Sequence, residues 1–473
     1  MTGHCSKNIT PDSITGMIFA MEGIKNTVVL LNGPMGCKFY HSTTSQFLAL
    51  RPPLYLSAAE GGEKAPVDYN FLNDWFFRQS RVPSTYLDGY DYVYGTKEKA
   101  AEGLRYLKEN VGFDLLVIVN SPGASLIGDH LLETAREIIG SRPVVMLESP
   151  GYSGSFCDGY QEAILALLRQ VLLPEREQKE SREAAGQEEK KREGQRQQEN
   201  GRGGKENGSA KSVNLLGMSI WQRYWEGDLA ELKRLFSLCG IQVNCCPGAG
   251  SSLAELRRLP EADLNVVLYP EMSRKTGELL REAWDMPCYV CPGPPVGFDG
   301  VIRMFEEIGR ILETDISPLR EACDRARALA WNKIDGIYQM CGLPDGCTFA
   351  IEGDSSVVYA YSRFFMEYLG MMPDCLSLTG GKDAEVSEML RQLLDEYGAG
   401  SPEKKEILDT RAELVFGEAN TIAALKTRNR AFCGIEISQP GMGYTDVLPK
   451  TQLGVTGSLF LIEQVLNGLM SKL

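Results

Sequence analysis

The sequence predicts an α/β protein built from three doubly wound, Rossmann-like parallel sheets. Short apolar runs rich in Val, Ile and Leu alternate with longer segments of helical periodicity, as in buried parallel strands and the helices that cover them. This alternation restarts twice, at Val213 and near Asn332. A chain of 473 residues with 43% hydrophobic content can form several cores.

The expected strands share one pattern in all three units: a short apolar or β-branched run followed by a turn or loop. In chain order they are Thr27–Leu31, Leu115–Val119, Pro143–Leu147, Val213–Gly217, Gln242–Cys246, Asn265–Tyr269, Pro287–Cys291, Cys347–Ile351, Cys375–Thr379, Glu413–Phe416 and Phe432–Ile437. The helices expected between them include Glu98–Glu109, Gln161–Leu172, Asp228–Leu238, Leu253–Leu259, Ser355–Tyr368 and Ala384–Tyr397.

The expected domains are residues 1–173, 213–331 and 332–440, followed by a C-terminal strand, turn and helix over 441–473. Between the first two, residues 174–212 contain no Leu, Ile, Val, Met, Phe, Tyr or Trp, and they carry ten basic and nine acidic side chains. Such a segment cannot bury a core, so we expect a disordered, charged linker. Because its charges nearly cancel, the net charge of -14 belongs to the folded parts.

Composition excludes several classes of function. The acidic balance argues against nucleic acid as a partner, since a binder needs a basic face to neutralise phosphates. The sequence contains no long apolar run and no signal-peptide pattern, so we expect a cytoplasmic protein that does not enter a membrane.

The 13 scattered cysteines are interpreted as reduced thiols with a few metal ligands. No Gly-x-x-x-x-Gly-Lys-Ser/Thr motif is present, so the chain is not expected to hydrolyse ATP itself.

The most informative stretch is the turn that follows the first strand, Gly33-Pro34-Met35-Gly36-Cys37. Ligands of open α/β sheets bind beyond the carboxyl ends of the strands, and Gly33 and Gly36 let the backbone approach a bulky group. A thiolate at Cys37 could hold iron or zinc, although a single cysteine after a tight turn is more often a buried free thiol. Cys5 favours the metal, because it opens the helical segment that leads into the same strand.

The arrangement from Cys5 to Cys37 resembles the nitrogenase component 1 family, whose members begin with a cysteine, a small-residue helix, an apolar strand and a Gly-Pro-x-Gly-Cys turn. Further similar segments are 92–95 (YVYG), 126–129 (LIGD), 149–154 (SPGYSG), 295–297 (PVG) and the closing segment from Gln439. The resemblance implies a nitrogenase component 1-like fold and an iron-sulfur cluster, bound by Cys5 and Cys37 at a subunit interface. It also implies a separate iron-sulfur ATPase that supplies electrons, and a C-terminal segment that packs back on the first domain.

The sequence departs from the family at two places. Relatives carry a third cysteine where this chain has Asn120-Ser121-Pro122-Gly123-Ala124-Ser125, so two thiolates must be supplemented to hold a 4Fe-4S cluster. Three arrangements stay open: a homodimer that contributes two cysteines per chain, a heterodimer with a related subunit, or a third ligand from Cys157 or Ser121. His41 could donate a proton or hydrogen bond near the cluster. The C-terminal segment has no histidine to hold the nitrogenase active-site cofactor, so dinitrogen reduction by that route is not expected.

The predicted function is a nitrogenase-like oxidoreductase subunit that passes low-potential electrons from an ATP-dependent reductase to an unidentified substrate. A scaffold for metallocofactor or tetrapyrrole assembly is the alternative, and a cluster-free structural subunit or a two-domain nucleotide-sugar-type binder is the third possibility. The CxxC spacing of Cys288 and Cys291 overlies a predicted strand, where the two thiols point to opposite faces, so core packing is expected for both.

Overall fold

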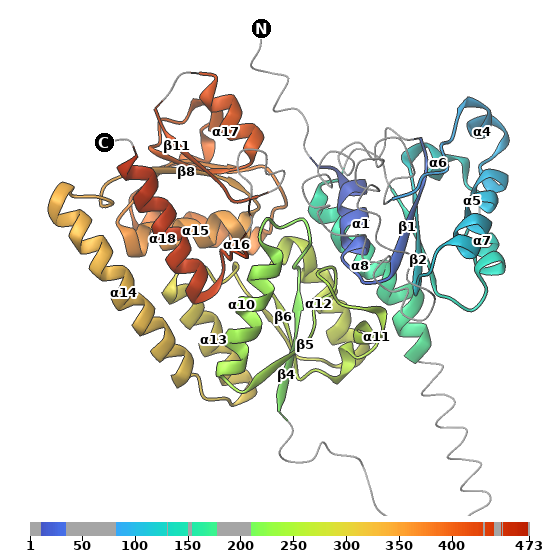
Figure 1. Cartoon of the computed structure of the whole chain (residues 1–473), viewed down its shortest axis with the longest axis horizontal. Helices are drawn as coiled ribbons and strands as arrows, with labels where there is room; N and C mark the ends of the chain where they lie inside the picture. The colour runs from blue at the N-terminus through green and yellow to red at the C-terminus, as the bar shows by residue number, and fades with distance from the viewer. Residues whose placement is uncertain are drawn as a thin grey trace, which may run out of the picture.

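The computed structural model describes residues 11–34, 82–129, 131–149, 154–176, 210–428, 431–438, 446 and 448–471. Within these residues the strands form three sheets, and every pairing between neighbouring strands is parallel. Figure 1 shows the three sheets as separate layers with helices around them, running from blue through green to red along the chain. The predicted fold class is confirmed.

The first sheet has the order β1-β2-β3, with β1 (Thr27–Asn32), β2 (Leu115–Asn120) and β3 (Val144–Glu148). Every residue of β1 and β2 is buried, which explains why both strands read as continuous apolar runs. The helices of this unit are α1 (Ser13–Glu22), α4 (Gly89–Tyr94), α5 (Lys97–Asn110), α6 (Pro122–Ile127), α7 (Leu131–Ile139) and α8 (Phe156–Leu167), which continues as a π-helix over Leu168–Leu172.

Helices α1 and α8 pack at backbone distance. A Cβ atom added at Gly16 would lie 2.0 Å from the carbonyl oxygen of Phe156, and one added at Gly159 would lie 1.9 Å from that of Ser13. All ten residues of α1 are buried, since the helix also faces the second unit, where Phe19 meets Trp221 at 4.9 Å between ring centroids. This contact holds the segment that leads into β1 against two units at once.

The second and third sheets repeat the same architecture, with the orders β5-β4-β6-β7 and β11-β10-β8-β9. Their strands are β4 (Lys211–Leu216), β5 (Ile241–Cys245), β6 (Leu264–Val267), β7 (Cys288–Val290), β8 (Thr348–Gly353), β9 (Met372–Leu378), β10 (Leu414–Gly417) and β11 (Cys433–Glu436). Their helices are α10 (Trp225–Leu238), α11 (Leu253–Leu256), α12 (Pro270–Trp284), α13 (Phe298–Leu312), α15 (Ser355–Leu369), α16 (Ala384–Glu396) and α17 (Ala419–Lys426). Short 3₁₀ segments lie at Leu259–Glu261, Pro402–Lys404 and Ile407–Asp409.

Two long helices join the second and third units. Helix α14 (Ser317–Cys341) runs without interruption through residues 331 and 332, where the sequence suggested a change of domain. Helix α18 (Gly454–Met470) packs on α10, α13, α14, β10 and β11, side by side with α14 and α13 in Figure 1. The resemblance implied that the C-terminal segment packs back on the first domain; its described helix, α18, packs on the second and third units.

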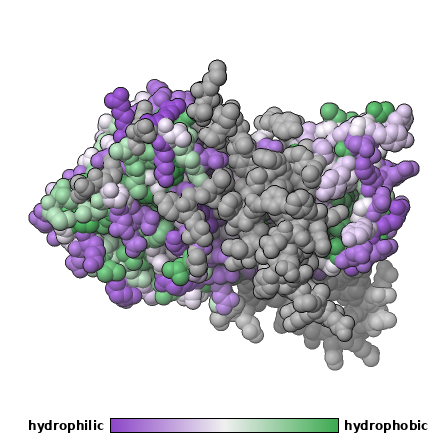
Figure 2. Space-filling view, turned by 45° about the horizontal axis from the view of Figure 1, so that its top comes forward, coloured by the Kyte–Doolittle hydropathy of each residue, from purple (hydrophilic) through white to green (hydrophobic). Residues whose placement is uncertain are grey.

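The ends of the expected linker are partly ordered. Residues 173–176 continue the helix after the π-helical segment, and Glu175 forms an ion pair with Arg257 at 2.8 Å. Strand β4 begins at Lys211, and the rest of the expected linker lies outside the described residues. No helix in the described part of the chain is long and apolar enough to cross a membrane. The face seen in Figure 2 mixes hydrophilic and hydrophobic residues on both sides of the grey region.

Candidate functional site

The carboxyl edge of the first sheet is tied together by side chains of its last strand residues. Asn32, Asn120 and Glu148 occupy neighbouring register positions on β1, β2 and β3. The Asn32 amide donates to Asn120 Oδ1 at 2.9 Å, and the Asn120 amide donates to Glu148 Oε1 at 2.8 Å. The other Glu148 oxygen accepts a hydrogen bond from Ser125 of α6 at 2.5 Å. This network fixes the strand ends from which the next loops leave.

Gly33 and Ser121, both expected at the site, meet directly beyond this network. A Cβ atom at Gly33 would lie 2.6 Å from Ser121 Cβ, so only glycine fits. The Gly33 N–H donates to Thr85 Oγ1 at 3.0 Å. Ser121 Oγ accepts from the Ala124 N–H at 3.3 Å and caps α6, so its hydroxyl already has a local structural partner.

The other expected site residues are placed differently. Cys5, Gly36, Cys37 and His41 lie outside the described residues. Cys157 lies on the first turn of α8 and faces the third unit, where its thiol donates to Asp354 Oδ1 at 3.4 Å. Burial, with nearby Asp354 and Glu271, raises the pKa of the Cys157 thiol well above its usual range. Because its thiol is hydrogen-bonded to Asp354 of the third unit, Cys157 is left out of the ligand set proposed below.

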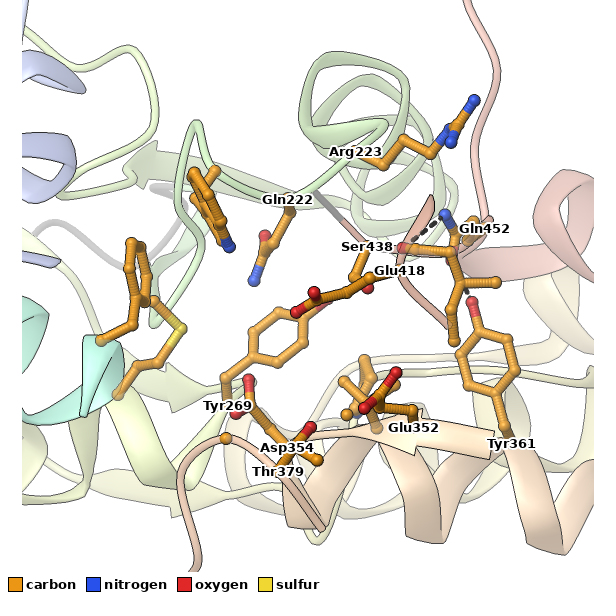
Figure 3. Close-up of a pocket in the computed structure, with 18 of the residues that line it drawn as sticks. Gln222, Arg223, Tyr269, Glu352, Asp354, Tyr361, Thr379, Glu418, Ser438 and Gln452 are labelled. Carbon is orange, nitrogen blue, oxygen red and sulfur yellow. Dashed lines mark hydrogen bonds between the residues drawn. The ribbon is translucent and has the colours of Figure 1, made fainter. Parts of the chain in front are cut away.

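A cavity of about 130 Å³ lies between the second and third units, at the carboxyl ends of their strands, and Ser155 and Phe156 of the first unit also line it. Gln222 reaches it from the loop after β4, and Glu352 and Asp354 reach it from the end of β8, as Figure 3 shows. Its walls combine aromatic rings with carboxylates. The aromatic residues are Phe156, Trp221, Tyr269 and Tyr361, and the acidic residues are Asp228, Glu352, Asp354 and Glu418.

Arg223, which lines the cavity, forms two ion pairs beside it. Arg223, whose side chain is only 3% exposed, pairs with Glu436 of β11 and with Asp446, which lies 2.9 Å from its Nη2. Asp228 accepts hydrogen bonds from Thr451 Oγ1 at 2.7 Å and from the Gln452 N–H at 2.8 Å. Burial raises the pKa of Asp228 to about 6. These contacts tie the segment before α18 to the second unit.

Two acidic residues, Glu271 and Asp354, lie close together where all three units meet. Glu271 of α12 is 8% exposed, and its Oε1 accepts from Ser355 Oγ at 2.6 Å and from the Ser356 N–H. Asp354 Oδ1 accepts from the Gly381 N–H at 2.6 Å. Burial, and then the charge of Asp354, raise the pKa of Glu271 to about 7, and burial also raises the pKa of Asp354.

Sequence reasoning missed this cavity, although the signal was present. Asp354 directly follows β8 and Glu418 directly follows β10, which is the same position relative to a strand that drew attention to Cys37. Glu271 gave no such signal, since it lies on the first turn of α12 and reaches Asp354 only through tertiary packing. Among the described residues, no group of three or more His, Cys, Asp or Glu side chains could hold a metal ion.

Comparisons with characterised proteins identify similar chains. The chain is 28% identical over 277 residues to the B subunit of the light-independent protochlorophyllide reductase of Halorhodospira halophila, an alignment that covers 58% of this chain and 47% of the relative. It is 30% identical over 297 residues to the B subunit of the same reductase from Parasynechococcus marenigrum. This alignment covers 62% of this chain and 52% of the relative. The chain thus spans about half the length of the curated relatives it matches.

Solved structures show the same fold over nearly the whole chain. The structure of nitrogenase Cp1 at pH 6.5 matches with a TM-score of 0.72 at 15% identity, and covers 98% of this chain and 92% of that chain. A second structure, at pH 5, gives a TM-score of 0.67. The family model described as nitrogenase component 1 type oxidoreductase matches residues 13–470. The chain therefore belongs to the nitrogenase component 1 type oxidoreductase family.

Proposed function

We propose that this chain is a nitrogenase-like oxidoreductase subunit that binds an iron-sulfur cluster at a subunit interface and reduces a substrate in the cavity between its second and third units. Low-potential electrons come from a separate, ATP-dependent iron-sulfur reductase, and the complex works in the cytoplasm. Family membership and the activity for which the curated relatives are named, a light-independent reduction, support this reaction class.

The proposed cluster ligands are Cys5 and Cys37. The observation that carries the assignment is the meeting of Gly33 and Ser121 at the carboxyl edge of the first sheet, four residues before Cys37. Soft thiolates are the ligands that an iron-sulfur cluster requires, and such a cluster can accept and release single electrons at low potential. Two thiolates per chain suit a 4Fe-4S cluster shared with a second, identical or related subunit.

Exposed apolar side chains next to this edge support a partner subunit. Leu126 of α6, the helix that Ser121 caps, is 89% exposed. Helix α4 exposes Tyr90, Val93 and Tyr94 beside it, and α4 and α6 contact each other. Large apolar side chains gathered on one surface mark sites of protein association.

The ligand assignment is tested by Cys5→Ser and Cys37→Ser, purified without oxygen and assayed for iron. Both variants should lose most of the iron of the parent protein because each removes a thiolate. Cys341→Ser is the matched control, since Cys341 is an exposed thiol at the end of α14 and should keep the parent iron content. Unchanged iron in Cys37→Ser would overturn the assignment. ATP-dependent turnover with a reductase partner would separate an enzyme from an assembly scaffold.

A further inference from the structure

The junction of the three units contains an acid pair, buried Glu271 and half-buried Asp354, to which the proposed function assigns no role. Glu271 comes from α12 of the second unit, and Asp354 comes from the end of β8 in the third. The Cβ atom that glycine lacks at position 381 would lie 2.7 Å from Glu271 Cβ and 2.7 Å from Cys157 Sγ. The Gly381 N–H is bonded to Asp354, so these four residues form one compact cluster.

The hydrogen bonds of the cluster leave one carboxyl oxygen unsatisfied. Glu271 Oε1 has two donors, the Ser355 hydroxyl and the Ser356 N–H. Glu271 Oε2 is buried and has no hydrogen-bond partner among the described residues. A charged oxygen in that position would be costly, and a proton on it lowers the cost because it removes the charge.

Asp354 connects the pair to the cavity. It occupies the N-cap position of α15 but makes no side-chain capping bond, since its carboxylate is turned toward Gly381 and Cys157. Asp354 also lines the cavity, as Figure 3 shows. A proton held by the pair is therefore next to the space in which a substrate would lie.

The charged and titratable groups around the pair do not neutralise it. Cys157 faces it from α8 as a protonated thiol, and Tyr269 faces it from the end of β6. Arg274, one turn beyond Glu271 on α12, is turned to the start of α16, where it pairs with Asp383 at 2.6 Å and with Glu385 at 3.0 Å. Among the described residues, no cation is a main cause of the raised pKa of either carboxyl.

We propose that Glu271 and Asp354 share one proton at neutral pH, and that Asp354 delivers it to the substrate as the substrate is reduced. This inference rests on the proposed function for the source of the electrons, which the reductase partner supplies. In the transfer, the O–H bond of Asp354 breaks and a bond from that hydrogen forms to a substrate atom that has gained electron density. Asp354 is left as a carboxylate and regains a proton from Glu271 or from solvent. Asp354 is the catalytic residue of this step, and Glu271 is a positioning residue that acts through it.

The shared proton is tested by infrared spectroscopy, which needs no cluster, substrate or reductase. At about pH 7 the parent protein should show the C=O stretch of a protonated carboxylic acid, because the pKa of Glu271 is about 7, whereas Asp228, whose pKa is about 6, is mostly ionised at this pH. Glu271→Gln should remove this band, and Asp354→Asn should move its titration to lower pH, because the charge of Asp354 helps to raise the pKa of Glu271. Asp383→Asn should leave it unchanged, since Asp383 is a neighbouring buried carboxylate that Arg274 keeps ionised. No band in the parent protein, or an unchanged band in both pair variants, would overturn the proposal.

Access from the cavity is tested in the same sample by dilution into heavy water. Because Asp354 lines the cavity, the band should shift to its deuterated frequency while the protein stays folded. A band that shifts only on unfolding would show that the pair is sealed and delivers no proton. These readouts do not depend on iron, so a failure of the cluster assignment and a failure of this inference remain distinguishable.

Discussion

Asn120 is the residue on which the carboxyl edge of the first sheet depends most. Asn120 is 2% exposed, accepts a hydrogen bond from buried Asn32 on one side and donates one to exposed Glu148 on the other, so one side chain links all three strands. The same edge carries Gly33 and Ser121, which meet at a distance that leaves no room for a Cβ atom on Gly33.

Asn120→Ala should lower the free energy of unfolding by roughly 2–4 kcal/mol, because it leaves the Asn32 amide and a Glu148 oxygen without this partner. Urea denaturation measures the change. The matched control is Asn110→Ala, whose amide bonds only to the exposed end of its own helix α5 and whose loss should cost less than about 1 kcal/mol. Equal effects of the two substitutions would contradict a structural role for the network.

Glu271 should make stability depend on pH in an unusual direction. Its pKa in the folded protein, about 7, lies above the ordinary value of 4.5, so the folded state binds a proton more tightly than the unfolded chain. This tighter binding of a proton stabilises the folded state. The stabilisation is fully present below about pH 4.5 and is lost as the pH rises through about 7. Relative to Glu271→Gln, the parent protein should lose on the order of 1–3 kcal/mol across this window.

The measurement is the free energy of unfolding at several pH values for the parent protein, Glu271→Gln and Asp383→Asn. Asp383 serves as the control because Arg274 lowers its pKa from an ordinary value of 3.8, so it does not titrate in this window. Parallel pH profiles for the parent protein and Glu271→Gln would show that Glu271 has an ordinary pKa.

At the scale of elements, the contact of α1 with α8 connects the start of the chain to the sheet. Gly16 and Gly159 allow the two helices to touch backbone to backbone, and α1 leads directly into β1. The path from the region of Cys5 to the region of Cys37 therefore depends on this helix pair.

Gly159→Ala should destabilise the protein by about 1–3 kcal/mol, because the added methyl group would lie 1.9 Å from the Ser13 carbonyl oxygen and force the helices apart. Gly103→Ala on α5 is the matched control. It has no atom within 4 Å of the new methyl group and should stabilise by up to about 1 kcal/mol through helix propensity. Thermal unfolding separates the two, and a stabilised Gly159→Ala would contradict the close packing.

The elements also show what sequence can and cannot predict. The strands were predictable because burial on both faces makes apolar runs such as the one at Leu115 unambiguous. Helix α14 was not, since few of its 25 residues are buried and its apolar side chains include exposed Leu329 and Trp331. The position of α18 depends on tertiary packing, which its own sequence does not encode.

At the scale of the whole molecule, two sites lie at the carboxyl ends of parallel strands. One is the edge of the first sheet near Gly33, and the other is the cavity between the second and third sheets. The first is a prediction from the sequence, because one local turn motif suggests it. The second was signalled only by acidic residues that directly follow strands, such as Asp354 and Glu418, because the cavity that they line forms only when separate units pack.

The central claim, an iron-sulfur cluster shared between two subunits, is tested most directly by the iron and sulfide content of oxygen-free protein whose oligomeric state is known. We predict about two irons per chain, which is about four per dimer, with the electron paramagnetic resonance signal of a reduced 4Fe-4S cluster after dithionite treatment. A well-folded dimer without iron, or about four irons on a monomeric chain, would contradict the account.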